Sequence, residues 1–433
     1  MLQRFRQTTR ALRSRNIRLF FGGQATSVIG SWMQHVAMGW LAYRLTGSTV
    51  VLGVIAFASQ FPSVILSPLA GALADRWSRY RMVVGAQILG MTQASVLAAL
   101  VVTDLVQVWH LVALAALLGV ASGVDIPARQ ALLVRLVQEP EDLPNAIALN
   151  SSLFNAARLI GAAAAGVLIA RFGEGPAFVL NAISYLSVLW ALWALELKEP
   201  KPQASGSVLG SMLEGLRYAG AFRPIGGVLL LLVGIAVVGI PYSVLLPAFV
   251  SDVLHGDADT LGGLTSATGL GALVGAIALA SRSSVVGLGR VISQASAVFG
   301  LSLVAFSLSR WTVLSGVILV FSGGSLLITT ASINTVLQTL VDEEKRGRVM
   351  SLYTVAFVGG SAIGGVIGGG VARLVGVPIA VAIAGVGCMI LSAWFTRLLP
   401  GLRAMVRPIY QEMGIIPELA TGVRSANSVR LQG

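Results

Sequence analysis

Apolar residues occupy twelve long stretches of the chain, which short polar segments separate. A helix needs about 20 apolar residues to cross the hydrocarbon core of a bilayer, whereas an isolated strand in lipid would leave its backbone groups unpaired. The pattern therefore predicts an all-α integral membrane protein with twelve transmembrane helices, six on each side of a central polar stretch. Their approximate ranges are 18–43, 49–74, 82–103, 107–127, 145–170, 176–195, 225–250, 260–281, 289–308, 312–338, 349–372 and 378–398.

Composition agrees with this interpretation. Hydrophobic residues make up 55% of the 433 residues and charged residues only 11%, whereas soluble domains carry about 25% charged residues. The 50 glycines would let membrane helices approach closely. The single cysteine, Cys388, cannot form an internal disulfide, and we interpret it as a buried apolar thiol.

Lysine and arginine lie mainly in alternate loops. If the N-terminus is cytoplasmic, the cytoplasmic segments hold 25 of these residues and the external loops hold four. The positive-inside rule then places both termini in the cytoplasm, and we expect a multi-pass protein of the inner (cytoplasmic) membrane. The net charge of +12 therefore indicates topology rather than nucleic-acid binding.

The same pattern divides the chain into five parts. Within the polar stretch, Val208 to Tyr218 is amphipathic and is interpreted as a helix on the inner membrane surface. The tail after Pro400 is basic and polar, which is typical of partial disorder. The five parts are an N-terminal arm (1–17), a six-helix bundle (18–195), a cytoplasmic linker (196–223), a second six-helix bundle (224–399) and a cytoplasmic tail (400–433).

A weak internal repeat relates the two halves. "ALADR" at 72–76 matches "ALASR" at 278–282, and "LLVRLV" at 132–137 matches "VLQTLV" at 336–341. A third match relates "ARFG" at 170–173 to "ARLVG" further on, with a similar offset. The near-constant offset indicates duplication of a six-helix unit, a plan that transporters use.

A compact charged motif follows the second predicted helix. It matches the signature G-x-L-a-D-r-x-g-R-(R/K)-(R/K), with Ser78 in place of the usual glycine. The chain thereby resembles the major facilitator superfamily, and stretches 30–48, 125–152 and 345–365 are similar to its drug and siderophore exporter branch, which includes enterobactin exporters and macrolide efflux proteins. The resemblance covers about residues 12–400 and implies the major facilitator fold. The matching motif residues are Gly71, Leu73, Ala74, Asp75, Arg76, Arg79 and Arg81.

The motif is a candidate conformational latch. A carboxylate at Asp75 can face the positive end of a helix, and the resemblance implies that this helix begins the eleventh span, near Arg348–Ser351. It also implies a contact between Arg79 and Asp125. Such contacts form only when the two halves close on the inside; alternatively, the motif is only a topogenic anchor. The candidate latch residues are Gly71, Asp75, Arg76, Arg79, Arg81 and Asp125.

Three ionisable residues fall inside predicted spans, where charges are costly and usually functional. Asp125 and Arg129 are an i,i+4 pair on one helix face, and Arg158 lies near the middle of the fifth helix. Asp125 is the leading carrier if transport is coupled to protons; alternatively, it forms a permanent ion pair with Arg129 or Arg158. Ala162 follows Gly161 where the exporter branch usually has Gly-Pro, so antiport and facilitated transport both remain open.

Polar side chains form stripes on two spans that line the cavity in the resembled fold, which uses helices 1, 4, 7 and 10. The alternative for each residue is ordinary interhelical hydrogen bonding. In helix 7, Pro241 and Pro247 should bend the backbone. The cavity candidates are Gln24, Ser27, Ser31, Gln34, His35 and Met38 of helix 1, Tyr242 of helix 7, and Thr330, Asn334 and Gln338 of helix 10.

In helix 11, Gly360, Gly364 and Gly368 recur every four residues and predict a close-packing face. The sequence contains no G-x-x-x-x-G-K-[ST] loop and no predicted soluble domain large enough for an enzyme. His110 and His255 lie near outer ends, so we expect neither a metal site nor a cofactor.

We therefore predict a secondary transporter, working as a monomer in the bilayer, that exports a lipophilic or amphipathic small molecule, drug-like or siderophore-like, as a proton antiporter. One alternative is a lipid or lysophospholipid flippase of the same fold. A less favoured alternative is a membrane sensor or scaffold that transports nothing, which would need no latch.

Overall fold

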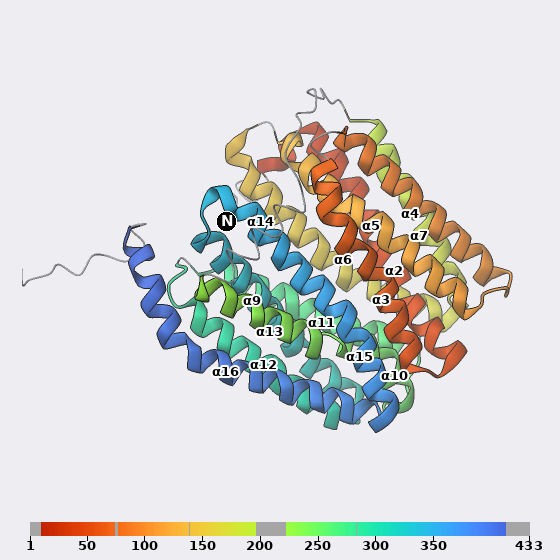
Figure 1. Cartoon of the computed structure of the whole chain (residues 1–433). Helices are drawn as coiled ribbons and strands as arrows, with labels where there is room; N and C mark the ends of the chain where they lie inside the picture. The colour runs from red at the N-terminus through yellow and green to blue at the C-terminus, as the bar shows by residue number, and fades with distance from the viewer. Residues whose placement is uncertain (1–9, 74–76, 138, 196–221, 283, 413–433) are drawn as a thin grey trace, which may run out of the picture.

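The computed structural model describes residues 10–73, 77–137, 139–195, 222–282 and 284–412, and the regular structure within them is helical. Twelve long helical segments, two of them interrupted, cross the molecule in these described ranges (Figure 1). Their number agrees with the twelve predicted spans, and the fold is that of an all-α membrane protein.

The first half contains six long helices that pack on one another, with α2 against α6 and α7, and α5 between α3 and α4. A 3₁₀ turn precedes α2 and another precedes α6. The bounds are η1 Arg10–Arg13, α2 Arg15–Thr46, α3 Thr49–Leu73, α4 Arg79–Val102, α5 Val108–Leu136, η2 Pro140–Asp142, α6 Leu143–Phe172 and α7 Gly175–Trp193.

The second half repeats this plan, with α13 between α11 and α12, and α16 against α12 and α9. Two of its spans are interrupted, one between α9 and α10 and one at the π-helical turn η3. The bounds are α9 Arg223–Val238, α10 Tyr242–Asp252, α11 Ala258–Ala280, α12 Leu288–Leu308, α13 Thr312–Leu340, α14 Glu343–Thr354, η3 Val355–Gly359, α15 Gly360–Val375 and α16 Val377–Glu412.

Local sequence explains several helix ends. Ser78 caps α4, because its Oγ accepts a hydrogen bond from the backbone N–H of Arg81 at 3.1 Å. Gly47 ends α2 in the left-handed conformation, with φ of 59°, which glycine adopts without steric cost. Pro241 ends the first part of the seventh span, so that α10 starts one residue later, whereas Pro247 lies inside α10.

The glycine face of α15 packs against this break. Gly360 lies beside Ala236, and Gly364 and Gly368 both lie against Pro241. A Cβ added at Gly368 would be 2.7 Å from Pro241 Cβ, so a larger residue there would push the helices apart. The small residues thus allow α15 to cross α9 and α10 at close range.

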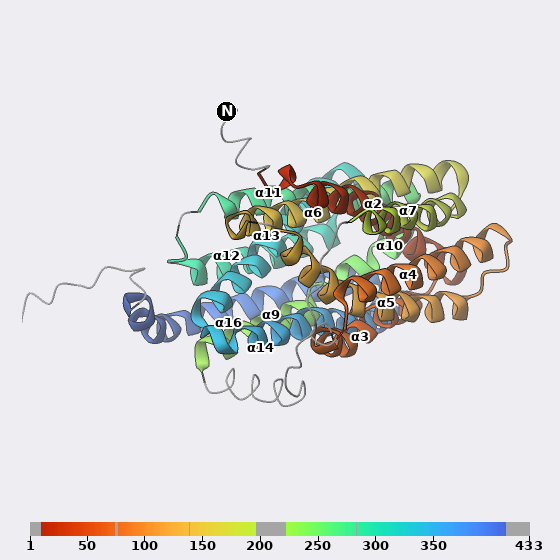
Figure 2. The same cartoon turned by 90° about the horizontal axis from the view of Figure 1, so that it is seen from above.

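The two halves meet along two seams (Figures 1 and 2). In one seam α6 packs against α11, and in the other α3 packs against α15. We call the side of the molecule with η1 and the loop residues 77–78, 281–282 and 284–287 the basic face. The opposite side, with the loops at 47–48 and 253–257, is the far face.

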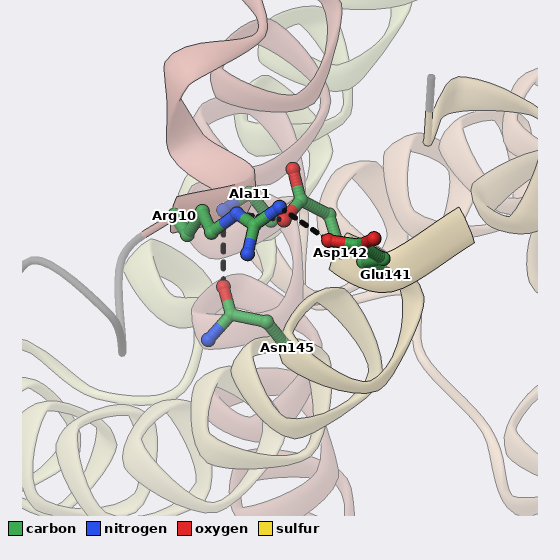
Figure 3. A network of polar contacts seen from close by, with 5 residues as sticks. All are labelled: Arg10, Ala11, Glu141, Asp142 and Asn145. Atoms are coloured by element: carbon green, nitrogen blue, oxygen red, sulfur yellow. Dashed lines mark hydrogen bonds and ion pairs between the residues drawn. The ribbon is translucent and has the colours of Figure 1, made fainter. Parts of the chain in front are cut away.

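The 3₁₀ turn η1 is fixed to the start of α6 (Figure 3). Arg10 Nη2 donates to Glu141 Oε2 at 3.0 Å, and Arg10 Nε lies 2.7 Å from Asp142 Oδ1. The backbone N–H of Ala11 donates to Asn145 Oδ1 at 3.0 Å. The hydrogen bond to Glu141 is the main reason that the pKa of Arg10 is raised. Since Arg10 and Glu141 are exposed, we assign the network a positioning role.

Eleven helices in the described ranges are long and apolar enough to cross a membrane. The twelfth, α2, has 32 residues but is not among those eleven, because its sequence is richer in polar residues. The last span is longer than predicted: α16 continues past residue 398 to Glu412, through Pro400 and Pro408. Val208 to Tyr218 and most of the linker lie outside the described residues.

Candidate functional site

A cavity of about 1030 Å³ lies between the two halves and opens toward the basic face. Its walls come from α2, α4, α5, α6 and α7 of the first half and from α11, α12 and α13 of the second. The loop residues Arg282 and Ser284 at its mouth belong to the basic face. Most of the wall is apolar, and its charged residues are Asp125, Arg129 and Arg282.

The buried charge of the cavity is a pair on α5. Arg129 Nη2 lies 2.8 Å from Asp125 Oδ2, one helical turn away, as i,i+4 spacing allows. Gln87 of α4 donates to the other oxygen of Asp125 at 2.8 Å, and Arg129 Nη1 donates to Gln24 Oε1 of α2 at 2.5 Å. The ring of Phe154 also faces the guanidinium, 5.2 Å from Arg129 Cζ. Four helices thus hold one ion pair.

Two amide atoms beside this pair lack a partner among the described residues. These atoms are Gln24 Nε2 and Gln87 Oε1. A buried polar atom without a hydrogen bond is costly, and both glutamines bind the pair through their other amide atom. The pair is therefore flanked by one buried donor and one buried acceptor whose hydrogen-bonding capacity is unused among the described residues.

The predicted stripe of α2 divides between two environments. Ser27, Ser31 and His35 line the cavity. Gln34 is instead buried inside the first half, where its Nε2 donates to Gln93 Oε1 at 2.9 Å and its Oε1 accepts from Asn181 Nδ2 at 2.8 Å. Met38 is buried in the apolar core, and Gln24 binds Arg129.

The predicted stripe of α13 lies on the face of the helix that adjoins the cavity-lining face, which carries Leu327, Ala331 and Thr335. Two of the stripe residues, Thr330 and Asn334, each come one residue before a cavity-lining residue, Ala331 and Thr335. At one end, Tyr353 Oη donates to the backbone oxygen of Thr330 at 3.3 Å, and at the other, Gln338 Nε2 donates to Asn334 Oδ1 at 2.5 Å.

Tyr242 is buried at the start of α10, where its ring meets Phe299 edge-on, with 6.0 Å between the centroids. It therefore lies in the core of the second half and is not among the residues that line the cavity.

Arg158 bridges the two halves. Its Nη2 donates to Thr268 Oγ1 of α11 at 2.8 Å, and its Cζ lies 5.2 Å from the centroid of Trp32, which lines the cavity. Its Nε has no partner among the described residues. Arg158 thus belongs to the α6–α11 seam, whereas Asp125 is bound by Arg129 and Gln87.

The latch candidates are described only in part. Asp75 and Arg76 lie outside the described residues. Arg79 begins α4 eight residues before Gln87, a separation of about 12 Å along the helix axis. Arg81 lies in the first turn of α4, and Gly71 lies near the end of α3.

The far face is closed by polar and glycine contacts between the halves. Tyr43 Oη of α2 donates to Asp252 Oδ2 of α10 at 2.5 Å. In the α6–α11 seam, a Cβ added at Gly262 would lie 2.7 Å from Gly166 Cα. In the α3–α15 seam, Thr49 Oγ1 donates to the backbone oxygen of Gly369 at 2.8 Å. The cavity is therefore open toward the basic face and shut toward the far face.

Several cavity residues were absent from the sequence-based candidates. Gln87 and Tyr185 lie on α4 and α7, outside the four helices expected to line the cavity. Trp32 and Phe154 supply aromatic surface. A glutamine within an otherwise apolar span was the available signal for Gln87, but no such signal distinguishes an aromatic cavity residue from one that faces lipid.

Residues 8–407 match a family described as "Transmembrane secretion effector". The chain is 27% identical over 397 residues to the enterobactin exporter EntS of Escherichia coli O1:K1 / APEC, covering 89% of this chain and 92% of that protein. It is 23% identical over 334 residues to the staphyloferrin A transporter of Staphylococcus aureus (strain NCTC 8325 / PS 47), covering 77% of this chain and 84% of that protein.

Solved structures agree on the fold. A POT family transporter in complex with 5-aminolevulinic acid superposes with a TM-score of 0.71 at 11% identity, covering 90% of this chain and 97% of that one. The human organic anion transporter MFSD10 superposes with a TM-score of 0.64 at 15% identity, covering 88% and 99%. At such identities the likeness establishes the architecture alone.

Proposed function

This chain belongs to the transmembrane secretion effector family, within the major facilitator superfamily of transporters, and from that premise we propose that it exports a lipophilic or amphipathic small molecule by alternating access. The single observation that carries the proposal is the cavity between the two halves, open on the basic face and shut on the far face. The family and its named relatives are transporters, not enzymes.

The direction of export rests on the distribution of charge. Among the described residues, most arginines and lysines lie on the basic face. By the positive-inside rule we infer that this face and both termini are cytoplasmic. The cavity then faces the cytoplasm, ready to load cargo. We place the protein in the inner membrane as a monomer, since each chain contains a whole cavity.

The proposed cargo is siderophore-like or drug-like. Two relatives are described as an enterobactin exporter and a staphyloferrin A transporter. The cavity offers aromatic surface at Trp32 and Phe154, with polar groups at His35 and Asn155, which suits a molecule with both apolar and polar parts. No named relative supports the lipid alternative.

We propose proton antiport with Asp125 as the carrier. Asp125 is buried at the cavity wall and bound to Arg129. A proton on its carboxyl group would weaken that ion pair and free the guanidinium for an anionic or polar part of the cargo. Arg158 would contribute to coupling without contacting Asp125. Its hydrogen bond joins α6 to α11 and would change when the two halves move.

We also propose that the charged motif between α3 and α4 acts as a latch in the opposite conformation, which is closed on the basic face. Gly71, Arg79 and Arg81 lie at the helix ends that would approach the second half when that face closes. The proposed latch also includes Asp75 and Arg76, which are assigned to it by the sequence motif alone.

The proposal is tested with purified protein in proteoliposomes that hold a pH gradient, to which lipophilic drugs and catechol-type siderophores are added. Cargo-evoked proton movement by the wild type, lost in Asp125→Asn, is the expected result. Asp104→Asn is the matched control, since this acid lies in an exposed loop. Cargo movement without protons would contradict antiport but not export, and no cargo movement at all would contradict export.

A further inference from the structure

A second cavity, of about 650 Å³, lies within the second half at the basic face. It is formed by the first turns of α9 and α12, the end of α13 and the end of α16. Its floor is apolar and includes Phe395, Leu399 and Leu402. The export mechanism proposed above makes no use of this cavity.

Four arginines surround this apolar floor. Arg282 and Arg290 come from the α11–α12 loop and the start of α12, and Arg403 and Arg407 come from successive turns of α16. No acidic residue lines the cavity, and none of the four forms an ion pair with a carboxylate among the described residues. The positive end of the α12 dipole points the same way.

The position of α16 places this site at the edge of the bilayer. With 36 residues, the helix is about 54 Å long, whereas the hydrocarbon core is about 30 Å thick. The helix also exposes Ile379, Ile383 and Ile390 on its outer surface, as expected for a lipid-facing helix. Its last turns, with Arg403 and Arg407, therefore reach the level of the phospholipid headgroups.

We propose that this cavity binds an anionic phospholipid of the surrounding membrane. The phosphate would lie among the four guanidinium groups, which bind phosphate oxygens in a fork geometry, and the upper part of an acyl chain would lie on the apolar floor. Basic pockets between transmembrane helices bind anionic headgroups in this manner. The chain beyond Glu412 is a poorer occupant, because it carries Arg424 and Arg430 against one acid, Glu418.

The lipid site shares a wall with the cargo cavity. Arg282, Val285 and Leu288 line both, so a bound headgroup would be separated from the cargo cavity by single side chains. The lipid would thereby stabilise this loop in the arrangement in which the cargo cavity is open.

The test measures retention of phosphatidylglycerol by the purified full-length protein, using native mass spectrometry after transfer from bilayers of phosphatidylcholine with phosphatidylglycerol. The double variant Arg403→Gln/Arg407→Gln should bind phosphatidylglycerol roughly thirtyfold more weakly, at about one kcal/mol for each arginine. The matched control is Arg171→Gln/Arg373→Gln, which changes two exposed arginines near the far face and should bind like the wild type.

Equal retention by the wild type and the Arg403→Gln/Arg407→Gln variant would overturn the proposal. Displacement of the lipid by millimolar inorganic phosphate would also overturn it, since the site would then bind a soluble anion. A truncation that removes residues 413–433 should leave retention unchanged. If phosphatidylglycerol bound only after that truncation, the chain's own tail would be the occupant, and the proposal would be wrong.

Discussion

At the scale of single residues, a buried amide network joins three helices of the first half. Gln34 lies between Gln93 and Asn181 and exchanges one hydrogen bond with each. In a lipid surrounding, these groups have no water to replace a missing partner. The network therefore fixes the positions of α2, α4 and α7 relative to one another.

The first prediction concerns Asn181, whose side chain is fully buried. Asn181→Ala removes the donor to Gln34 Oε1 and should lower the free energy of unfolding by about 1–2 kcal/mol. Chemical unfolding in mixed micelles measures this change. Gln338→Ala, which removes an exposed amide, is the control and should have little effect; equal losses in both variants would contradict the assigned role of the network.

At the scale of elements, the sequence predicted the helices well and their rotations less well. Hydropathy located twelve spans because lipid requires long apolar helices. Thr330, Asn334 and Gln338 do share one face of α13 by their i,i+4 spacing, but hydropathy does not say which neighbour a polar face meets. Here, Tyr353 of α14 lies beside that face, and the cavity meets the adjoining face of α13.

Helix ends were also less predictable. Hydropathy ends a predicted span where polar residues begin, so the last span was predicted to end near residue 398. The helix itself continues to Glu412, because its backbone hydrogen bonds do not depend on apolar side chains. The pairing of Asp125 with Arg129 followed from i,i+4 spacing. The hydrogen bonds of Gln24 and Gln87 to this pair could not be predicted from spacing, since they depend on which helices lie beside α5.

The second prediction tests the α6–α11 seam. Gly262→Val would overpack its contact with Gly166 at a cost of about 1–3 kcal/mol, which shifts the balance toward the arrangement open on the far face by roughly 5- to 150-fold. In a Cys388→Ser background, a reporter Leu261→Cys should then react faster with a membrane-impermeant maleimide. Gly263→Val is the control, because a Cβ there meets nothing within 4 Å. Identical labelling rates in the two variants would show that the seam does not keep the far face shut.

At the scale of the whole molecule, the arrangement of loops makes the proposed orientation testable. Trp77 lies on the basic face and is 62% exposed, whereas Trp311 lies on the far face and is 75% exposed. In intact cells, Trp311→Cys should react with an impermeant maleimide and Trp77→Cys should react only after permeabilisation. The reverse pattern would place the basic face outside and would contradict the proposal that this cavity loads cargo from the cytoplasm.

The polar character of α2 has a consequence for how the protein is made. This helix precedes the other long helices of the described residues along the chain, yet it is not among the eleven that are apolar enough to span a membrane by composition. The buried amide group of Gln34 is hydrogen-bonded to residues of α4 and α7. Both of these helices emerge from the ribosome after α2. We therefore expect the nascent α2 to stay beside the insertion machinery until α7 arrives, so that the first half enters the lipid as a group of helices rather than one span at a time.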